Sequence, residues 1–255
     1  MKRVAFIADE HSGANSGLTP PEWWGTDCLR KVHRDTWTMY INDLVNKIKP
    51  VDVLISNGDL IEGPETPSVC ITSDREIQSE MAIQAIEAWE SPKIIIVEGT
   101  PFHTGKRETW ESMIANRVGA EKFGAHVFVS CNGLMFDCKH FTGGTTIPRH
   151  IPPSLTRQEA WNKLKAEVGD EPKADVFVRS HIHTCLGGSK FFGGEREVHF
   201  IATPGLQAYS NYGALKVERQ IHWGCIWYDV EDDGSFKMHR KIMTVKAQQA
   251  KAVIV

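Results

Sequence analysis

The triplet Asp9-Glu10-His11 follows the first hydrophobic run of the chain, Val-Ala-Phe-Ile-Ala at 4–8. That run predicts a short buried strand, and the glycines and small polar residues after the triplet predict a loop. The triplet therefore stands at the carboxyl end of a strand, where open α/β sheets gather their ligand-binding groups. An Asp oxygen and a His nitrogen two residues apart can converge on one cation, provided that the chain supplies further ligands elsewhere.

Four further predicted strands also lead into an Asp or a His. The strands are expected at 51–56, 94–97, 134–139 and 176–179, and the residues that follow them are Asp59, His103, His140 and the pair His181 and His183. A Gly-Asp pair alone is usually a turn, and a lone His is usually a satisfied polar residue. In an extended segment, however, alternating His-x-His would place both imidazoles on one side. Five such strand ends on one edge of a sheet predict a metal site.

In chain order these motifs are Asp-x-His, Gly-Asp, Gly-x-x-x-His, a single His and His-x-His. Over residues 4–205 they resemble those of the calcineurin-like metallophosphoesterases, and the chain is similar to the compact, single-domain members from phages and bacteria. The resemblance implies an α/β fold of two packed mixed β-sheets flanked by helices, a four-layer sandwich. It also implies a metal-dependent phosphoric ester hydrolase.

The resemblance assigns six residues to two divalent cations. Asp9, His11 and His183 would hold the first ion, His140 and His181 the second, and Asp59 would bridge the two. One Asp can bridge cations about 3.5–4 Å apart, the separation that suits in-line phosphoryl displacement. A hydroxide that bridges the ions would be the nucleophile. Mn²⁺ is the expected metal, with Fe, Zn or Ni as alternatives, since mixed His/Asp sites accept them all.

The third motif departs from the family pattern, Gly-Asn-His-Asp/Glu. It has no Asn and its His is displaced, as Gly99-Thr100-Pro101-Phe102-His103. Thr100 is a candidate for a weak oxygen ligand, with water in that position as the alternative. His103 is expected to be the general acid, with a replacement metal ligand as the alternative, because imidazole serves both tasks. Glu62 stands where the family often has Asp or Asn, and we expect it to orient a ligand histidine or a bound water.

The loop at 12–25 directly follows the first ligands and is expected to overhang the site. Its Trp23 and Trp24 either stack on a base or pack to anchor the loop. Arg107 and Arg149 are candidates for phosphate contacts, with solvated surface charges as the alternative. The expected substrate is a phosphodiester such as DNA, RNA or a nucleotide. The alternative enzyme is a phosphomonoesterase or protein phosphatase. The alternative that is not an enzyme is a metal-binding scaffold without catalysis.

Hydrophobic periodicity predicts the elements that position these residues. Two capping boxes, Ser73 with Glu76 and Thr156 with Glu159, predict helix starts, and Asp233-Gly234 predicts a hairpin turn. Helices are expected over 26–49, 73–90, 107–118 and 156–168, and further strands over 126–130, 197–202, 224–230 and 235–243.

Composition limits the function classes. The 255 residues are 41% hydrophobic and 24% charged with a net charge of −3, so no global basic field favours nucleic acid. No stretch reaches the roughly 18 apolar residues of a membrane span, and the N-terminus has no apolar signal region. The six cysteines include no CxxC pair, which favours a reducing, cytoplasmic compartment. We expect one domain over residues 1–245 and a loosely held tail at 246–255.

Overall fold

The computed structural model describes residues 1–63, 70–104, 110–141, 151–190, 197–208 and 221–243. Within these residues the first sheet contains β1 (Lys2–Ile7), β2 (Val53–Ser56), β3 (Ile94–Val97), β4 (Lys122–Gly124), β10 (Trp223–Val230) and β11 (Phe236–Met243). Its strand order is β11-β10-β1-β2-β3-β4. Strands β1 to β4 are parallel neighbours, whereas β10 pairs antiparallel with both β1 and β11, so the sheet is mixed.

The second sheet contains β5 (Val127–Cys131), β6 (Leu134–Cys138), β7 (Val176–Arg179), β8 (Leu186–Lys190) and β9 (Val198–Ala202). Its order is β5-β6-β7-β9-β8. The inner strands β6, β7 and β9 are parallel, and the two edge strands are antiparallel to their neighbours, so this sheet is also mixed. Parallel inner strands end on the same edge, which brings the residues after β6, β7 and β9 together.

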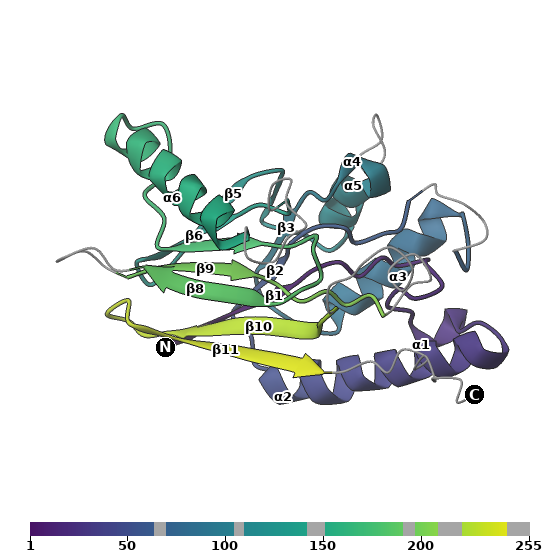
Figure 1. Cartoon of the computed structure of the whole chain (residues 1–255). Coiled ribbons are helices and arrows are strands. Elements are labelled where there is room, and N and C mark those ends of the chain that lie inside the picture. Colours follow the sequence, from purple (N-terminus) through teal and green to yellow (C-terminus); the bar gives the residue numbers. More distant parts are fainter. Residues whose placement is uncertain (64–69, 105–109, 142–150, 191–196, 209–220, 244–255) are drawn as a thin grey trace, which may run out of the picture.

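Helices cover the outer faces of both sheets (Figure 1). They are the 3₁₀ turn η1 (Pro21–Trp23), α1 (Asp27–Met39), the π-helical η2 (Tyr40–Val45), α2 (Asn46–Ile48), α3 (Arg75–Glu87), α4 (Pro101–Thr104), α5 (Trp110–Arg117) and α6 (Ile151–Glu167). Apolar residues of η2, α3 and α5 pack on the first sheet, and α6 lies against the second sheet. The predicted four-layer α/β sandwich of two mixed sheets is confirmed.

The alternation of side chains along β1 shows how the layers are held. Ala5 and Ile7 face the helices, whereas Val4 and Phe6 face the second sheet. Between the sheets the Phe136 ring lies 5.4 Å from Phe6 and 5.2 Å from Tyr228, centroid to centroid. Such tilted and edge-on aromatic pairs join the two sheets.

Two predicted helix starts are wrong. At α3 the N-cap is Asp74 rather than Ser73, and its carboxylate accepts from the backbone N–H groups of Glu76 and Ile77. At the other helix, α6 begins at Ile151, so Thr156 lies inside the helix instead of capping it. The residues after Ile151 are two prolines, which suit a first helical turn because its N–H groups have no intrahelical partner.

Other predictions differ only in detail. The helix expected over 26–49 is found as α1, η2 and α2, with a π-helical segment in its middle. Two short strands were not predicted: β4 has three residues, and β8 (Leu-Gly-Gly-Ser-Lys) lacks an alternating apolar pattern. The tail at 246–255 lies outside the described residues, and the single domain over 1–245 stays a prediction.

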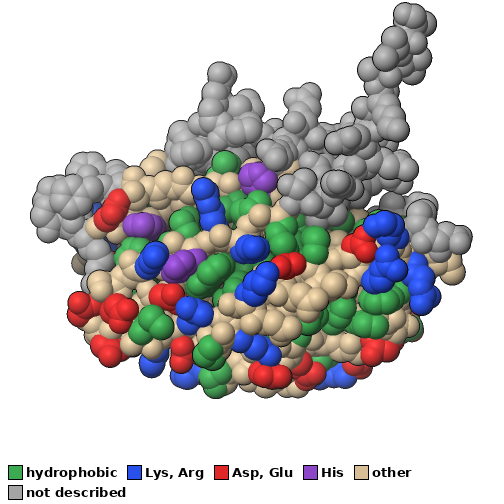
Figure 2. All heavy atoms as spheres, turned by 90° about the horizontal axis from the view of Figure 1, so that it is seen from below, with side chains coloured by type: hydrophobic (Ala, Val, Ile, Leu, Met, Phe, Trp, Pro, Cys, Tyr) green, Lys and Arg blue, Asp and Glu red, His purple; other side chains and the backbone are tan. Residues whose placement is uncertain are grey.

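The face seen from below in Figure 1 carries Lys and Arg side chains interspersed with Asp and Glu (Figure 2). This mixture agrees with the small net charge of −3. Among the helices of the described residues, none combines the length and the apolar character that a membrane crossing requires.

Candidate metal centre

Six predicted ligands meet at the carboxyl ends of β1, β2, β6 and β7. They form two groups, and in each group the ligand atoms lie within 4.8 Å of one another. The first group is Asp9, His11 and His183, and the second is Asp59, His140 and His181. The sequence predicts that these residues follow strands. The fold adds that the strand ends of both sheets meet, which brings the residues together.

The first group is tightly packed. Asp9 Oδ1 lies 3.2 Å from His183 Nε2, and that nitrogen lies 3.3 Å from His11 Nε2. In the second group, His140 Nε2 lies 2.9 Å from Asp59 Oδ2. The two groups are neighbours, because His140 Nε2 also lies 3.8 Å from Asp9 Oδ1.

Two buried atoms test whether this donor set fits cations. Asp9 Oδ1 and His140 Nε2 are both inaccessible to solvent, and neither makes a hydrogen bond. His140 Nε2 is near the Asp59 carboxylate but is not aligned as a donor to it. A buried polar atom without a partner is costly, and native proteins seldom leave one unsatisfied. These atoms have the chemistry and position of divalent metal ligands, so the residues present fit the ions that the motifs imply.

The backbone is strained where the ligands stand. Asp9, His11 and Asp59 have φ values of +56°, +44° and +56°, and His181 and His183 have +73° and +49°. Non-glycine residues rarely adopt this left-handed region, and such strain gathers at functional sites. The prediction of an extended His-x-His segment is therefore wrong. Its two imidazoles reach the centre from left-handed backbone turns, and they enter different ligand groups.

Gly99 must be a glycine because the chain passes very close to Asp59. A Cβ at position 99 would stand 2.3 Å from Asp59 Oδ1, a distance that no side chain can occupy. The loop after β3 can therefore approach the carboxylate of the loop after β2 only with glycine at this position.

Opposite charges set the protonation of the second group. Burial alone would raise the pKa of Asp59, but the charge of the nearby His140 holds that pKa well below the ordinary value. For His140, burial lowers the pKa, while the charge of Asp59 outweighs this effect and raises the pKa to about 10. Without metal, the site is therefore held together by protonated imidazole against carboxylate.

Glu62 contacts two histidines of the site. Its Oε2 lies 2.9 Å from Nδ1 of His11, and its backbone carbonyl accepts a hydrogen bond of 2.7 Å from Nδ1 of His103. Burial would lower the pKa of His11, but the hydrogen bond and charge of Glu62 raise it to about 9. Glu62 is thus placed to orient the imidazole ring of His11.

His103 lies beside the ligand groups with one nitrogen directed toward them. Its Nδ1 is held by the Glu62 carbonyl, and its Nε2 lies 4.0 Å from Asp59 Oδ2. Burial and the charge of His11 lower the pKa of His103. His103 also belongs to a third group of potential ligand atoms, with His11 and Glu62. The general-acid role and the ligand role both remain predictions.

Two site residues were missed in the sequence. Glu111 of α5 is buried, and its carboxylate accepts from the backbone N–H groups of Leu60 at 2.9 Å and Gly99 at 2.6 Å. The backbone carbonyl of Asn57 accepts from His140 Nδ1 at 2.6 Å. Any residue supplies a backbone carbonyl, so the sequence carries no signal for this contact, and Glu111 stands in a helix where nothing in the sequence distinguishes it from a surface residue.

In the described part of the chain, the two tryptophans expected to bind substrate make no contact with the ligand groups. The Trp24 indole donates to the Thr19 carbonyl at 3.0 Å, which anchors the loop at 12–25. Within the described residues, no hydrogen bond, ion pair or ring contact joins Trp23 or Trp24 to the ligand groups. Arg107 and Arg149 lie outside the described residues.

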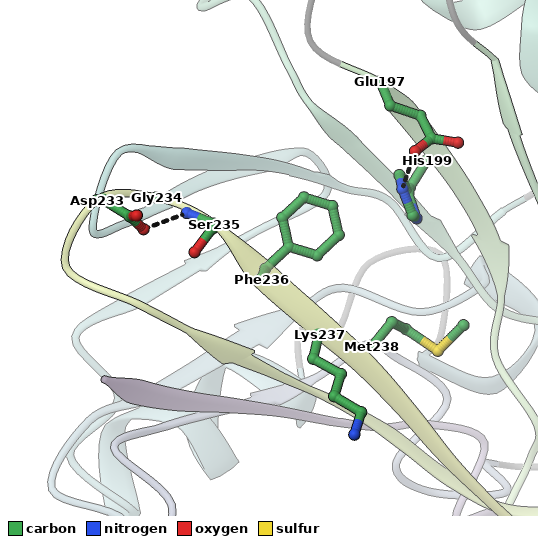
Figure 3. A pocket seen from close by; sticks show the side chains of 8 residues that line it. All are labelled: Glu197, His199, Asp233, Gly234, Ser235, Phe236, Lys237 and Met238. Carbon is green, nitrogen blue, oxygen red and sulfur yellow. Dashed lines mark hydrogen bonds and ion pairs between the residues drawn. The ribbon is translucent and has the colours of Figure 1, made fainter.

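A separate hollow of about 690 Å³ lies at the start of β9 and β11 (Figure 3). Glu197 and His199 line one side of it and form an ion pair at 3.7 Å, and Phe236 points into it from the opposite strand. The start of β9 is the end away from the metal centre, because the end of β9 leads to Gly205, which abuts His183. This hollow therefore shares no residue with the candidate centre.

No family model and no curated protein sequence matches the chain. Solved structures similar to it include Vps29 from Entamoeba histolytica complexed with zinc, at 15% identity and a TM-score of 0.46, over 94% of this chain and 98% of that chain. A second is an archaeal phosphodiesterase, at 13% identity and a TM-score of 0.48, over 94% and 99%. A third is the phosphoesterase Yfce from E. coli, at 12% identity and a TM-score of 0.45, over 93% and 98%.

Two of these solved structures are thus described as a phosphodiesterase and a phosphoesterase. The two mixed sheets with His and Asp groups at their strand ends form the four-layer fold that the resemblance implies. At such low identities and TM-scores, the function must be argued from the site itself.

Proposed function

We propose that this protein is a dimetal-dependent phosphoesterase that hydrolyses phosphodiester bonds, as a nuclease or a nucleotide phosphodiesterase. The observation that carries the proposal is the contact between two three-residue ligand groups, joined where His140 Nε2 lies 3.8 Å from Asp9 Oδ1. Two adjacent His/Asp groups are the donor set for a pair of divalent transition metals. When bound, such a pair supplies a water nucleophile at neutral pH and neutralises phosphate oxygens.

The motifs imply which residues would hold the ions. Asp9, His11 and His183 would hold one ion, His140 and His181 would hold the other, and Asp59 would be shared. Mn²⁺ is the proposed metal, and Fe, Zn and Ni fit the same donors.

His103 is placed to give a proton to the leaving group. Its Nδ1–H is fixed on the Glu62 carbonyl, so its Nε2 is directed to the centre and carries the transferable proton when the ring is charged. Burial and the charge of His11 lower the pKa of His103, so the charged ring is the minor form at neutral pH and the stronger acid toward a departing alkoxide. His103 therefore orients and donates a proton, and it need not be a metal ligand.

Thr100 stands where the family has an Asn, and its hydroxyl donates to Asp59 at 3.1 Å while its oxygen lone pairs stay available to a cation. This departure is the specific observation that favours the second candidate function, a metal-binding scaffold without catalysis. The scaffold would bind two metal equivalents and hydrolyse no phosphoester.

Purified protein loaded with Mn²⁺ tests the proposal on bis-p-nitrophenyl phosphate and p-nitrophenyl phosphate. We expect faster hydrolysis of the diester, and Asp59→Asn should abolish it. Asp35→Asn is the matched control, since Asp35 makes only surface ion pairs, with Lys31 and Arg34. A faster monoester reaction would identify a phosphomonoesterase instead, and metal binding without either reaction would identify the scaffold.

The cytoplasm remains the proposed compartment. The described cysteines Cys70, Cys131, Cys138, Cys185 and Cys225 are all free thiols, as expected in a reducing environment.

A further inference from the structure

Two exposed phenylalanine side chains flank the candidate metal centre. Phe102 is 59% exposed and Phe141 is 50% exposed, and no other phenylalanine among the described residues is exposed. Each is the chain neighbour of a site histidine, since Phe102 precedes His103 and Phe141 follows His140. Single exposed apolar residues are common, so it is their shared position that requires an explanation.

The two rings also contact imidazoles of the site. The Phe102 ring centroid lies 5.0 Å from that of His103, and the Phe141 centroid lies 5.2 Å from that of His181. Each ring thus has one part against a site histidine and another part open to solvent.

The two phenylalanines approach the centre from different sheets. Phe102 belongs to α4, which follows β3 of the first sheet, whereas Phe141 follows β6 of the second. The ligand residues follow β1, β2, β6 and β7, which include β6 itself and β2, the neighbour of β3. A phosphodiester bound at the centre has two ester substituents, and the two rings offer aromatic surfaces beside it.

We propose that Phe102 and Phe141 stack against the unpaired bases of a nucleotide phosphodiester whose phosphate occupies the metal centre. This inference rests on the proposed function and narrows its substrate to single-stranded nucleic acid or a dinucleotide. Stacking on an aromatic side chain is tolerant of sequence, and it requires bases whose faces are accessible, which a duplex does not offer. The net charge of −3 favours stacking over a general phosphate attraction as the source of affinity.

Two small diesters with the same leaving group test the proposal. Thymidine 5′-(p-nitrophenyl) phosphate carries a base, and methyl p-nitrophenyl phosphate does not. The measured quantity is the ratio of kcat/KM for the thymidine ester to kcat/KM for the methyl ester. Phe102→Leu and Phe141→Leu keep apolar bulk but remove the flat ring. Trp161→Leu is the matched control, because Trp161 is 60% exposed on α6, outside the centre.

We expect at least one phenylalanine variant to lower the ratio by about 5-fold or more, the effect of losing one stacked base. The Trp161 variant should leave the ratio unchanged. A ratio near one for the wild-type protein, or equal ratios in all variants, overturns the inference while the proposed function stands. Hydrolysis of neither ester by the wild-type protein would instead contradict the proposed function.

A binding measurement keeps the inference testable in that last case. Fluorescence anisotropy of the Mn²⁺-loaded proteins with labelled oligothymidine should show weaker binding by the phenylalanine variants than by the Trp161 variant. Equal binding by all of them overturns the inference. Under the inference, a single strand should bind more tightly than the matching duplex. Tighter binding of the strand than of a dinucleotide assigns the strand as the substrate, and equal binding assigns the dinucleotide.

Discussion

Thr100 donates two hydrogen bonds to the carboxylate of Asp59, from its backbone N–H at 2.6 Å and from its hydroxyl at 3.1 Å. The hydroxyl thereby fixes the orientation of the residue proposed to bridge two ions. Thr100→Val keeps the shape and removes this donor, and we expect it to weaken metal binding about 10- to 100-fold. Titration calorimetry with Mn²⁺ measures the change. Thr100→Ser retains the hydroxyl and should bind metal nearly as the wild type does. Equal affinities for the Val variant and the wild type would contradict this role.

Metal binding should release protons. His11 and His140 have pKa values raised to about 9 and about 10, so both are charged at pH 7 in the metal-free protein. A metal ligand must be neutral imidazole, so we expect at least two protons to leave on loading at pH 7, and a third if a bound water ionises. Calorimetry in buffers of different ionisation enthalpy counts these protons. Binding heats that are independent of the buffer would refute the expectation.

Glu111 should make the metal-free protein less stable as the pH rises. Burial, then the Asp59 charge, raise its pKa from 4.5 to about 7. The folded state therefore binds this proton more tightly than the unfolded state does. Its contribution to stability is present below pH 4.5 and is lost as the pH rises through about 7. The free energy of unfolding of the wild type, relative to that of Glu111→Gln, should fall between pH 5 and 8 in urea titrations with EDTA. A constant difference would show that Glu111 does not titrate in this range.

Asp137 and Arg179 form an ion pair of 2.9 Å, and the arginine side chain is fully buried. Asp137→Asn leaves that charge unpaired, which costs about 3–5 kcal/mol of the free energy of unfolding. Burial would raise the pKa of Asp137, but the His126 hydrogen bond and the Arg179 charge lower it below 3.8. The stabilisation is therefore present above pH 3.8 and is lost as the pH falls through the lowered pKa.

Urea unfolding of both proteins at pH 7 and in acid measures this loss. Asp43→Asn is the control, because Asp43 pairs with Lys47 at the surface, where ion pairs contribute about 0–1 kcal/mol. If the Asp137 variant were as stable as this control at pH 7, the buried pair would have no net stabilising role.

Much of the fold followed from local patterns in the chain. The apolar runs at β1, β2 and β3 and the turn at Asp233-Gly234 were readable because a buried strand is continuous in hydrophobicity and a hairpin needs turn residues. The start of α6 could not be predicted in this way, because a capping-box pattern inside the helix resembles a true N-cap. The short strands β4 and β8 owe their existence to pairing with neighbours rather than to their own sequences.

Part of the candidate site could likewise be predicted from the sequence, and part of it could not. Asp9, His140 and the other motif residues could be named from the sequence, because their types and positions after strands are visible there. The left-handed backbone at His181 could not be predicted from the sequence, because tertiary structure forces this non-glycine residue into that conformation. Glu111 was also hidden, since its role depends on two backbone N–H groups that are distant from it in the chain.

Titration of metal-free protein with Mn²⁺, while hydrolysis of bis-p-nitrophenyl phosphate is followed, tests the central claim most directly. The two adjacent ligand groups predict that activity rises with added metal and reaches a plateau at two equivalents per chain. EDTA should abolish the activity, and Asp59→Asn should show none at any metal ratio. Full activity in EDTA, or no hydrolysis at any metal ratio, would contradict the assignment of a dimetal phosphodiesterase.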